Sequence, residues 1–364
     1  MFRAVSVLGL LLAFACSLFA QSLSPEVIHE IDALVEHERT ADQLPGVSVA
    51  VAVNGQVIFK KAYGLADLEN SVPATPDSLF RTASVAKPMT AVGALELVEQ
   101  GKLDLDAPIQ KYCPAFPQKP WPITTRELLG HLSGIRAYQN REIYSTVHYV
   151  NTVDGMSFFK DDPLLFEPGT RYLYTTFGYT VVGCVMEGAS GEKYPEYMEE
   201  HVFKPAGMEH IAVDDVYAII PHRAAGYDML NGKVINMPLN DTSYKIPGGG
   251  YVASAEDLVR FASAVMNGKL LRPETITAMW TSQKTKDGKE TRYGMGWGRA
   301  DLDGELIIAH SGDQPGTRTS LFLIPSRKMA FAVMINLEGA DAPELNRNVA
   351  RLVLKGCGAA CKVH

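Results

Sequence analysis

Two residues three positions apart, Ser84 and Lys87, carry side chains that can act together as a nucleophile and its base. They open a segment, residues 85–98, in which Lys87 and Glu96 are the only formal charges. A helix of that composition is apolar nearly all round and is expected inside a domain. Residues i and i+3 are neighbours on a helix, so the serine hydroxyl and the lysine amine would meet. Burial lowers the pKa of a lysine, which can then deprotonate a serine.

The Ser-x-x-Lys spacing alone is weak evidence, because both residue types are common. The chain contains a second copy, Ser157 to Lys160, which we interpret as accidental. The first copy differs from it in standing at the head of a predicted buried helix. Pro88 fits this reading, since a proline is tolerated in the first turn, where its missing N–H costs little.

The composition is that of a soluble enzyme-sized protein. The 364 residues are 46% apolar and 21% charged, which is ordinary for globular chains. The net charge of −7 offers no basic surface for nucleic acid, so we expect a small-molecule or peptide partner. No group of Cys and His residues has the spacing of a zinc site, and no metal or organic cofactor is expected.

The first 20 residues have the pattern of a cleavable secretory signal. Arg3 precedes an apolar run, residues 4–15, and a small residue, Ala20, ends the segment. A short membrane anchor and a lipoprotein cysteine at Cys16 are the alternatives. We expect residues 21–364 to be the mature chain, periplasmic or extracellular, without a stable membrane span after cleavage.

Four cysteines would remain after that cleavage. Cys357 and Cys361 lie four apart and could form a small terminal disulfide in an oxidising compartment. Cys113 and Cys184 are expected to be buried free thiols or to be left unpaired.

Hydrophobic periodicity predicts strands at both ends of the chain and helices in the middle. Residues 46–53 and 56–59 flank Asn54-Gly55, which is a strong hairpin signal. The other predicted elements are helices at 25–40, 84–101, 124–132, 179–189, 254–266 and 343–354, and strands at 305–310, 320–324 and 329–336.

This order favours an α/β fold of the α+β type, in which one antiparallel sheet is flanked by helices. The sheet part would comprise about residues 21–80 and 245–364, and a helical part, about 84–240, would be inserted between them. The helix at Ser84 would then lie at the seam of the two parts, which is a common position for an active site.

Two further segments could complete a site around Ser84. A Pro-Gly turn at 168–169 would place Tyr174 on a short loop before a helix, where it could carry a proton. His310-Ser311-Gly312-Asp313 ends a predicted strand, and its glycine would let the backbone approach a substrate carbonyl.

The ordered set Ser-x-x-Lys, Tyr-x-Thr and His-Ser-Gly resembles the motifs of serine β-lactamases and penicillin-binding proteins. The chain looks most like the branch with class C β-lactamases, D-alanyl-D-alanine carboxypeptidases and related esterases, the peptidase S12-like group. Further family-like phrases lie at 128–135, 166–169, 248–250 and 293–297. Segments 101–106, 131–136 and 172–174 also resemble mitochondrial serine β-lactamase-like proteins.

The resemblance implies a β-lactamase/transpeptidase-like fold and a role for each motif residue. Ser84 would be the acylated nucleophile, Lys87 its base or the relay to it, and Tyr174 the second proton carrier. His310 would replace the family's lysine, and Ser311 and Gly312 would line the substrate strand. The N–H groups of Ser84 and Asp313 would form the oxyanion hole.

Two residues depart from the family pattern. Thr176 stands where the family usually has an asparagine that binds the substrate's side-chain carbonyl. His310 weakens a fixed positive charge, because an unperturbed histidine is mostly neutral at pH 7. Both changes argue against efficient β-lactam turnover and leave acyl transfer intact.

We therefore expect an exported serine hydrolase that acts on a peptide, amide or ester through an acyl-enzyme. One alternative is a penicillin-binding or sensing module with slow deacylation. Another is a non-catalytic scaffold with the same fold. Retention of Ser84, Lys87 and Tyr174 favours the enzyme, since a scaffold would be free to lose them.

Overall fold

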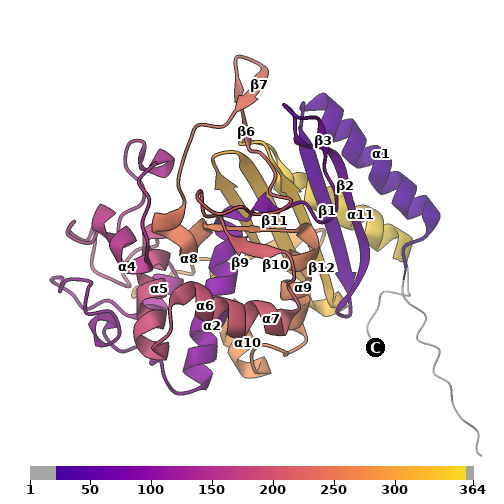
Figure 1. Ribbon diagram of the computed structural model, residues 1–364. Helices are drawn as coiled ribbons and strands as arrows, with labels where there is room; N and C mark the ends of the chain where they lie inside the picture. The colour runs from indigo at the N-terminus through magenta and orange to yellow at the C-terminus, as the bar shows by residue number, and fades with distance from the viewer. Residues whose placement is uncertain (1–21, 358–364) are drawn as a thin grey trace, which may run out of the picture.

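A seven-stranded antiparallel sheet, built from both ends of the chain, forms the centre of the molecule (Figure 1). The computed structural model describes residues 22–357, so the predicted signal at 1–20 and Cys361 lie outside the described residues. The strand order is β3-β2-β1-β12-β11-β10-β9, which places the first hairpin beside the last strand. These strands are β1 (Gly46–Val53), β2 (Gln56–Asp67), β3 (Val72–Pro73), β9 (Gly298–Leu302), β10 (Glu305–Gln314), β11 (Thr317–Ile324) and β12 (Met329–Ile335).

The predicted hairpin at Asn54-Gly55 is confirmed. Both turn residues have positive φ, 51° for Asn54 and 85° for Gly55, as a two-residue hairpin turn of this kind requires. Strand β1 pairs with β2 on one side and with β12 on the other, so the N-terminal hairpin completes the sheet.

Both faces of the sheet are buried, which explains why its central strands are apolar without interruption. Val47, Val49, Val51 and Val53 face one core with Phe331 and Val333, beneath α1 (Pro25–Ala41) and α11 (Ala342–Cys357). The alternate residues of β1 and β12 are mostly alanines and face α9 (Ala255–Met266) and the helical part. Small side chains on this face let α9 pack closely against the sheet.

The middle of the chain forms the helical part (Figure 1). Its helices are α2 (Ala86–Glu99), α3 (Thr125–Leu129), α4 (Thr152–Gly155), α5 (Thr176–Ser190), α6 (Tyr194–Met198) and α7 (Lys204–Ala206). Helices α8 (Ile246–Gly249) and α10 (Pro273–Trp280) come later in the chain. Helix α2 is buried on all sides, as its sequence predicted, and packs against α5 and α8.

The structure adds short elements that the sequence pattern did not reveal. A three-stranded sheet joins β4 (Phe80–Arg81), β8 (Tyr251–Ala253) and β5 (Ile211–Val213), and β6 (Tyr227–Leu230) pairs with β7 (Lys233–Asn236). Strand β9 and helix α10 were also not predicted. Strands of two to five residues are too short for a period of two to stand out.

The expectation that Cys113 and Cys184 are unpaired is wrong. Their sulfur atoms form a disulfide that links the segment after α2 to helix α5, across a sequence separation of 71. Both residues belong to the buried core of the helical part. Connectivity depends on which backbones lie together in space, which cysteine spacing alone does not give.

Within residues 22–357, no helix combines the length and the apolar character needed to cross a membrane. Across the same residues, no three His, Cys, Asp or Glu side chains are grouped so as to hold a metal ion.

Candidate active site

Ser84 lies in a one-turn 3-10 helix, Ala83–Val85, that leads directly into α2. The preceding residue, Ala83, has a φ of 46°, a left-handed conformation that is uncommon for a residue with a side chain. Backbone strain of this kind persists only where the surroundings hold it in place, and it occurs often at functional sites.

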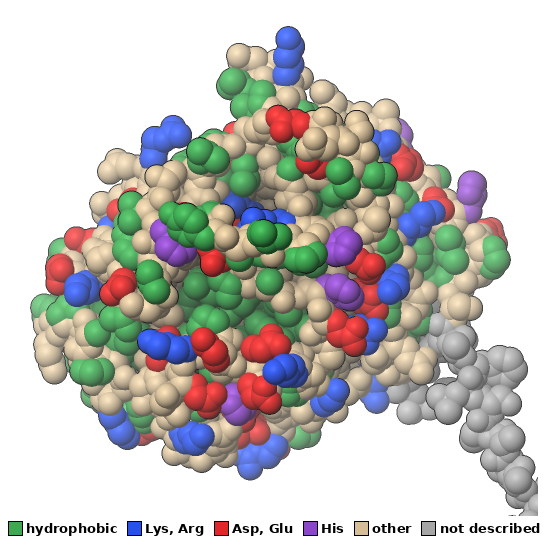
Figure 2. Space-filling view, in the orientation of Figure 1, with side chains coloured by type: hydrophobic (Ala, Val, Ile, Leu, Met, Phe, Trp, Pro, Cys, Tyr) green, Lys and Arg blue, Asp and Glu red, His purple; other side chains and the backbone are tan. Residues whose placement is uncertain are grey.

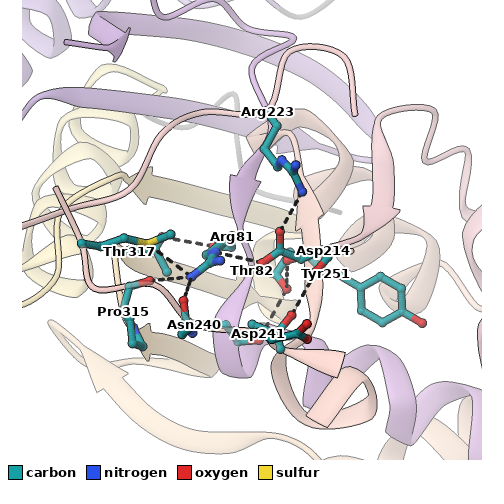
Figure 3. Close-up of polar contacts among 12 residues, drawn as sticks. Arg81, Thr82, Asp214, Arg223, Asn240, Asp241, Tyr251, Pro315 and Thr317 are labelled. Carbon is teal, nitrogen blue, oxygen red and sulfur yellow. Dashed lines mark hydrogen bonds and ion pairs between the residues drawn. The ribbon is translucent and has the colours of Figure 1, made fainter. Parts of the chain in front are cut away.

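Arg81, three residues before Ser84, supplies much of that support (Figure 3). Its guanidinium pairs with Asp214 at 2.8 Å and donates hydrogen bonds to the Asn240 side chain at 2.7 Å and to the Pro315 carbonyl at 3.0 Å. One side chain therefore ties β4 to the 214–240 loop region and to the β10–β11 turn.

The backbone beside Arg81 is held from both sides as well (Figure 3). The hydroxyls of Thr317 and Thr319 on β11 donate to the Arg81 carbonyl, at 3.2 and 2.9 Å. The Thr82 N–H donates to the Tyr251 carbonyl of β8 at 2.9 Å. The chain thus enters the turn at Ser84 from a fixed position.

Lys87 projects from the first turn of α2 toward Ser84. Its Nζ lies 2.9 Å from the Ser84 Oγ, 2.8 Å from the Gly248 carbonyl oxygen and 3.1 Å from the Thr176 Oγ1. The predicted i, i+3 contact is therefore present, and three oxygen atoms fix the amine. The second copy of the spacing has no such surroundings, since Ser157 is exposed.

The Lys87 side chain is fully buried, with 0% of its surface exposed. Burial, and then repulsion by the nearby Lys245, hold the pKa of Lys87 well below its usual value. No carboxylate is among the groups that influence this pKa. A desolvated amine without a counter-ion favours its neutral form, which can accept a proton from Ser84.

Tyr174 lies on the loop before α5, as predicted, and its ring centre is 4.9 Å from the Lys87 Nζ. His131 holds this loop on both sides of the tyrosine. The His131 carbonyl accepts from the Leu173 N–H at 2.9 Å, and its Nδ1 accepts from the Thr175 N–H at 3.2 Å. The His131 and Tyr174 rings also pack together, with centroids 4.2 Å apart.

The surroundings of Tyr174 keep its hydroxyl protonated. Burial raises the pKa of Tyr174 well above its usual value, and the neighbouring Ser84 hydroxyl opposes this effect only in part. A protonated phenol next to Ser84 is suited to donate a proton to a departing group rather than to remove one from the serine.

His310 lies on β10, and both of its ring nitrogens are occupied. Nδ1 is 2.7 Å from the Ser311 carbonyl, to which it can only donate, and Nε2 is 2.9 Å from the Tyr293 hydroxyl. The contact with the Ser311 carbonyl places a hydrogen on Nδ1. Burial and the nearby Lys87 lower the pKa of His310 to about 3, so the ring provides no positive charge at neutral pH.

Gly312 brings β10 against the nucleophile. A Cβ at this position would lie 2.5 Å from the Thr82 carbonyl oxygen and 3.1 Å from the Ser84 nitrogen. Only a glycine allows so close an approach of the two backbones. Ser311 and Asp313, on either side, are exposed, and the Asp313 carboxylate pairs with Arg318 at 2.6 Å.

The structure also brings together residues that the sequence did not single out. Tyr138 packs edge-on against Phe177, the residue after Thr176, so its ring lies near the hydroxyl that contacts Lys87. Lys245, in the turn before α8, is buried close enough to Lys87 to influence its pKa. Periodicity could not find Tyr138 and Lys245, because they lie 54 and 161 positions after Ser84 in the chain.

A cavity of about 320 Å³ lies beside Tyr174 and His310, between the start of β9 and the start of α11. Tyr174, Tyr293, His310, Ser311, Arg299 and Arg347 are among the residues that line it. The cavity therefore adjoins the part of β10 that begins at His310, where β9 no longer pairs with this strand.

The family to which the chain belongs follows from its similarity to known proteins. The family model described as Beta-lactamase matches residues 31–354, nearly the whole described chain. The chain belongs to the β-lactamase family. The motifs at Ser84, Tyr174 and His310 had predicted this family, and the prediction is confirmed.

Similar proteins agree with this assignment. The human mitochondrial serine beta-lactamase-like protein LACTB is 30% identical over 377 residues, covering 77% of this chain and 69% of its own. The penicillin-binding protein from Bacillus halodurans is 26% identical, with a TM-score of 0.75 over 88% of this chain and 98% of its own. The octameric penicillin-binding protein homologue from Pyrococcus abyssi has a TM-score of 0.78 at 24% identity, covering 90% of this chain and 77% of its own. The predicted α/β fold, with helices flanking an antiparallel sheet, is confirmed.

Proposed function

We propose that this β-lactamase-family protein is an exported serine hydrolase that cleaves a peptide, amide or ester through an acyl-enzyme at Ser84. The observation that carries the proposal is the 2.9 Å contact between the Ser84 hydroxyl and the amine of the fully buried Lys87. A serine is a weak nucleophile by itself and becomes an effective one beside a base of lowered pKa.

In the acylation step, neutral Lys87 takes the hydroxyl proton as Ser84 Oγ attacks the substrate carbonyl carbon. The N–H groups of Ser84 and Asp313 stabilise the negative charge on the carbonyl oxygen, and the glycine contact at Gly312 supports their proximity. Tyr174 then protonates the leaving nitrogen or oxygen and is reprotonated through the Lys87 ammonium. Attack by water on the ester at Ser84 releases the acid and restores the enzyme.

Two roles differ from those implied by the family motifs. Thr176 accepts a hydrogen bond from Lys87, so we assign it to orienting the base. His310 is neutral and bound on both ring nitrogens, so we assign it to fixing Tyr293 and the strand rather than to holding a substrate carboxylate. Both assignments favour a peptide or simple ester over a β-lactam as the efficient substrate.

The disulfide between Cys113 and Cys184 supports the export part of the proposal. Disulfides persist in oxidising compartments and are rare in the reducing cytosol. Together with the apolar N-terminal segment, the disulfide favours a protein that folds after secretion.

The test is the intact mass of the mature protein after a fluorophosphonate probe and, separately, after a penicillin. Stoichiometric adducts that are absent from Ser84→Ala would support the nucleophile. A penicillin adduct that decays in seconds would favour a β-lactamase, and one that persists for hours would favour a penicillin-binding module. No adduct with either reagent would overturn the proposal and favour the idle scaffold.

A further inference from the structure

A second buried lysine, Lys245, lies near the nucleophile and is not used by the proposed mechanism. Only 2% of its surface is exposed. Its ammonium lies 5.4 Å from the ring centre of Tyr244 and 5.7 Å from that of Tyr138. Removing a charged group from water is costly unless a partner compensates for the lost hydration.

Within residues 22–357, no carboxylate lies within ion-pair distance of Lys245, and no hydrogen bond affects its titration. Burial, and then repulsion by Arg81, lower the pKa of Lys245 to about 7, and Asp214 and Glu338 oppose this effect from further away. Asp214 is already paired with Arg81 at 2.8 Å. The two aromatic faces are the direct contacts of the ammonium, and they do not neutralise its charge.

The position of Lys245 relative to Ser84 follows from a chain of contacts. Tyr138 packs on the ring of Phe177, the residue after Thr176, at a centroid distance of 5.0 Å, and Thr176 accepts from Lys87, which contacts Ser84. Lys245 packs on the ring of that same Tyr138 and is felt electrostatically by Lys87. One tyrosine ring therefore separates the free ammonium from the polar groups around the nucleophile.

The position of Lys245 matters because His310 provides no positive charge near Ser84 at neutral pH. The family's strand lysine is replaced by His310, whose ring nitrogens are both occupied. Arg81 is neutralised by Asp214 and bonded to Asn240. Within the described residues Lys245 makes no ion pair, and it lies close enough to Lys87 to influence its pKa. Figure 2 shows basic side chains inside a hollow on this face of the molecule, with hydrophobic side chains around it.

We propose that Lys245 binds a carboxylate on the acyl part of the substrate, so that the enzyme prefers acyl groups that carry a negative charge a few bonds from the scissile carbonyl. The inference rests on the proposed hydrolase function of Ser84 and adds the substrate class to it. Tyr138 and Tyr244 flank the ammonium, and the bound carboxylate supplies the missing counter-ion. Such an anion stabilises the ammonium, because an opposite charge favours the charged form.

The test compares two substrates that differ in one charge, the mono-4-nitrophenyl ester of glutaric acid and its methyl ester. We expect the wild type to prefer the glutarate half-ester. Lys245→Met lowers kcat/KM for the half-ester by about tenfold or more, the usual effect of losing a charge-assisted hydrogen bond, and leaves that for the methyl ester within about twofold. Lys245→Arg retains most of the preference. Lys233→Met, at an exposed position on β7, is the matched control.

An equal loss for both esters would overturn the inference, because Lys245 would then act through Lys87 or through the fold. A KM effect on the half-ester without a kcat effect would support binding. Thermal unfolding of each variant identifies any that fail to fold.

A second measurement keeps the inference testable if no ester is hydrolysed. Calorimetry with Ser84→Ala compares glutarate with glutaramide, which has the same length and no charge. Tighter binding of glutarate that disappears in the Ser84→Ala, Lys245→Met protein supports the carboxylate site even if the hydrolase proposal fails. Equal binding of glutarate and glutaramide overturns the inference even if Ser84 is an active nucleophile.

Discussion

At the scale of single residues, the proposed chemistry depends on two groups beside the Ser84 hydroxyl. The Lys87 amine must be neutral, and the Tyr174 phenol must be protonated. Burial achieves both, because it disfavours the charged form of either group. It lowers the pKa of Lys87 and raises that of Tyr174. The two groups therefore divide the proton transfers, with Lys87 as the acceptor and Tyr174 as the donor.

We predict that Tyr174→Phe lowers kcat by about 10²-fold or more, since it removes the proton donor and leaves the ring packing on His131 intact. The loss should be larger for an amide than for a 4-nitrophenyl ester, whose leaving group needs no proton. Steady-state kinetics on both substrates measure this, with Tyr217→Phe, at an exposed position, as the control. Unchanged turnover of the amide would remove Tyr174 from the mechanism.

Residue types and spacing predicted Ser84, Lys87 and Tyr174, because helix geometry fixes an i, i+3 contact and a Pro-Gly turn marks a loop. The occupied ring of His310 was not predictable, since its partner Tyr293 is defined only by the folded strand. The contacts of Lys245 and of the Gly248 carbonyl with the site were not predictable for the same reason. Contacts between distant segments require the structure.

At the scale of elements, the site depends on the contact between β10 and the turn before α2. Gly312 has no Cβ, and the Thr82 carbonyl and the Ser84 nitrogen occupy the space where one would stand. The two atoms belong to backbone that Arg81 and the β11 threonines hold in place, so the turn cannot easily move aside.

We predict that Gly312→Ala lowers the free energy of unfolding by about 1–3 kcal/mol and slows acylation of Ser84 by a larger factor than this loss of stability explains. The added methyl group pushes β10 away from Ser84 and separates the proposed oxyanion donors. Urea unfolding and the rate of fluorophosphonate labelling measure the two effects. Gly298→Ala on β9 is the control, because its Cβ would approach no atom closer than 3.3 Å. Normal labelling in Gly312→Ala would contradict this account of the strand.

At the scale of the whole molecule, the two chain ends form one sheet and the middle forms the helical part, with α2 between them. Strands at the ends and helices in the middle predicted this arrangement, since each long element has a clear period. The division into about 21–80 with 245–364 and about 84–240 stays a proposal about domains. The short sheet β4-β8-β5 was beyond sequence reasoning, because it pairs segments of two or three residues.

The disulfide belongs to this scale, because it closes a loop across the helical part. We predict that reducing it, or replacing Cys113 and Cys184 together by serine, lowers the free energy of unfolding by up to about 4 kcal/mol through the greater freedom of the unfolded chain. Urea unfolding with and without dithiothreitol measures this. Thiol counts that show both cysteines free in the secreted protein would contradict the disulfide and weaken the case for export.

The central claim is that buried, neutral Lys87 activates Ser84, and its most direct test is the rate of fluorophosphonate labelling between pH 5 and 10. Because the neutral amine is the active form, the rate should rise as Lys87 loses its proton and level off well below the usual lysine pKa of 10.5. Lys87→Met should lower the plateau by about 10²-fold or more, and Lys87→Arg should be equally impaired because arginine keeps its proton. A folded Lys87→Met protein that labels at the wild-type rate, with the same dependence on pH, would contradict the account.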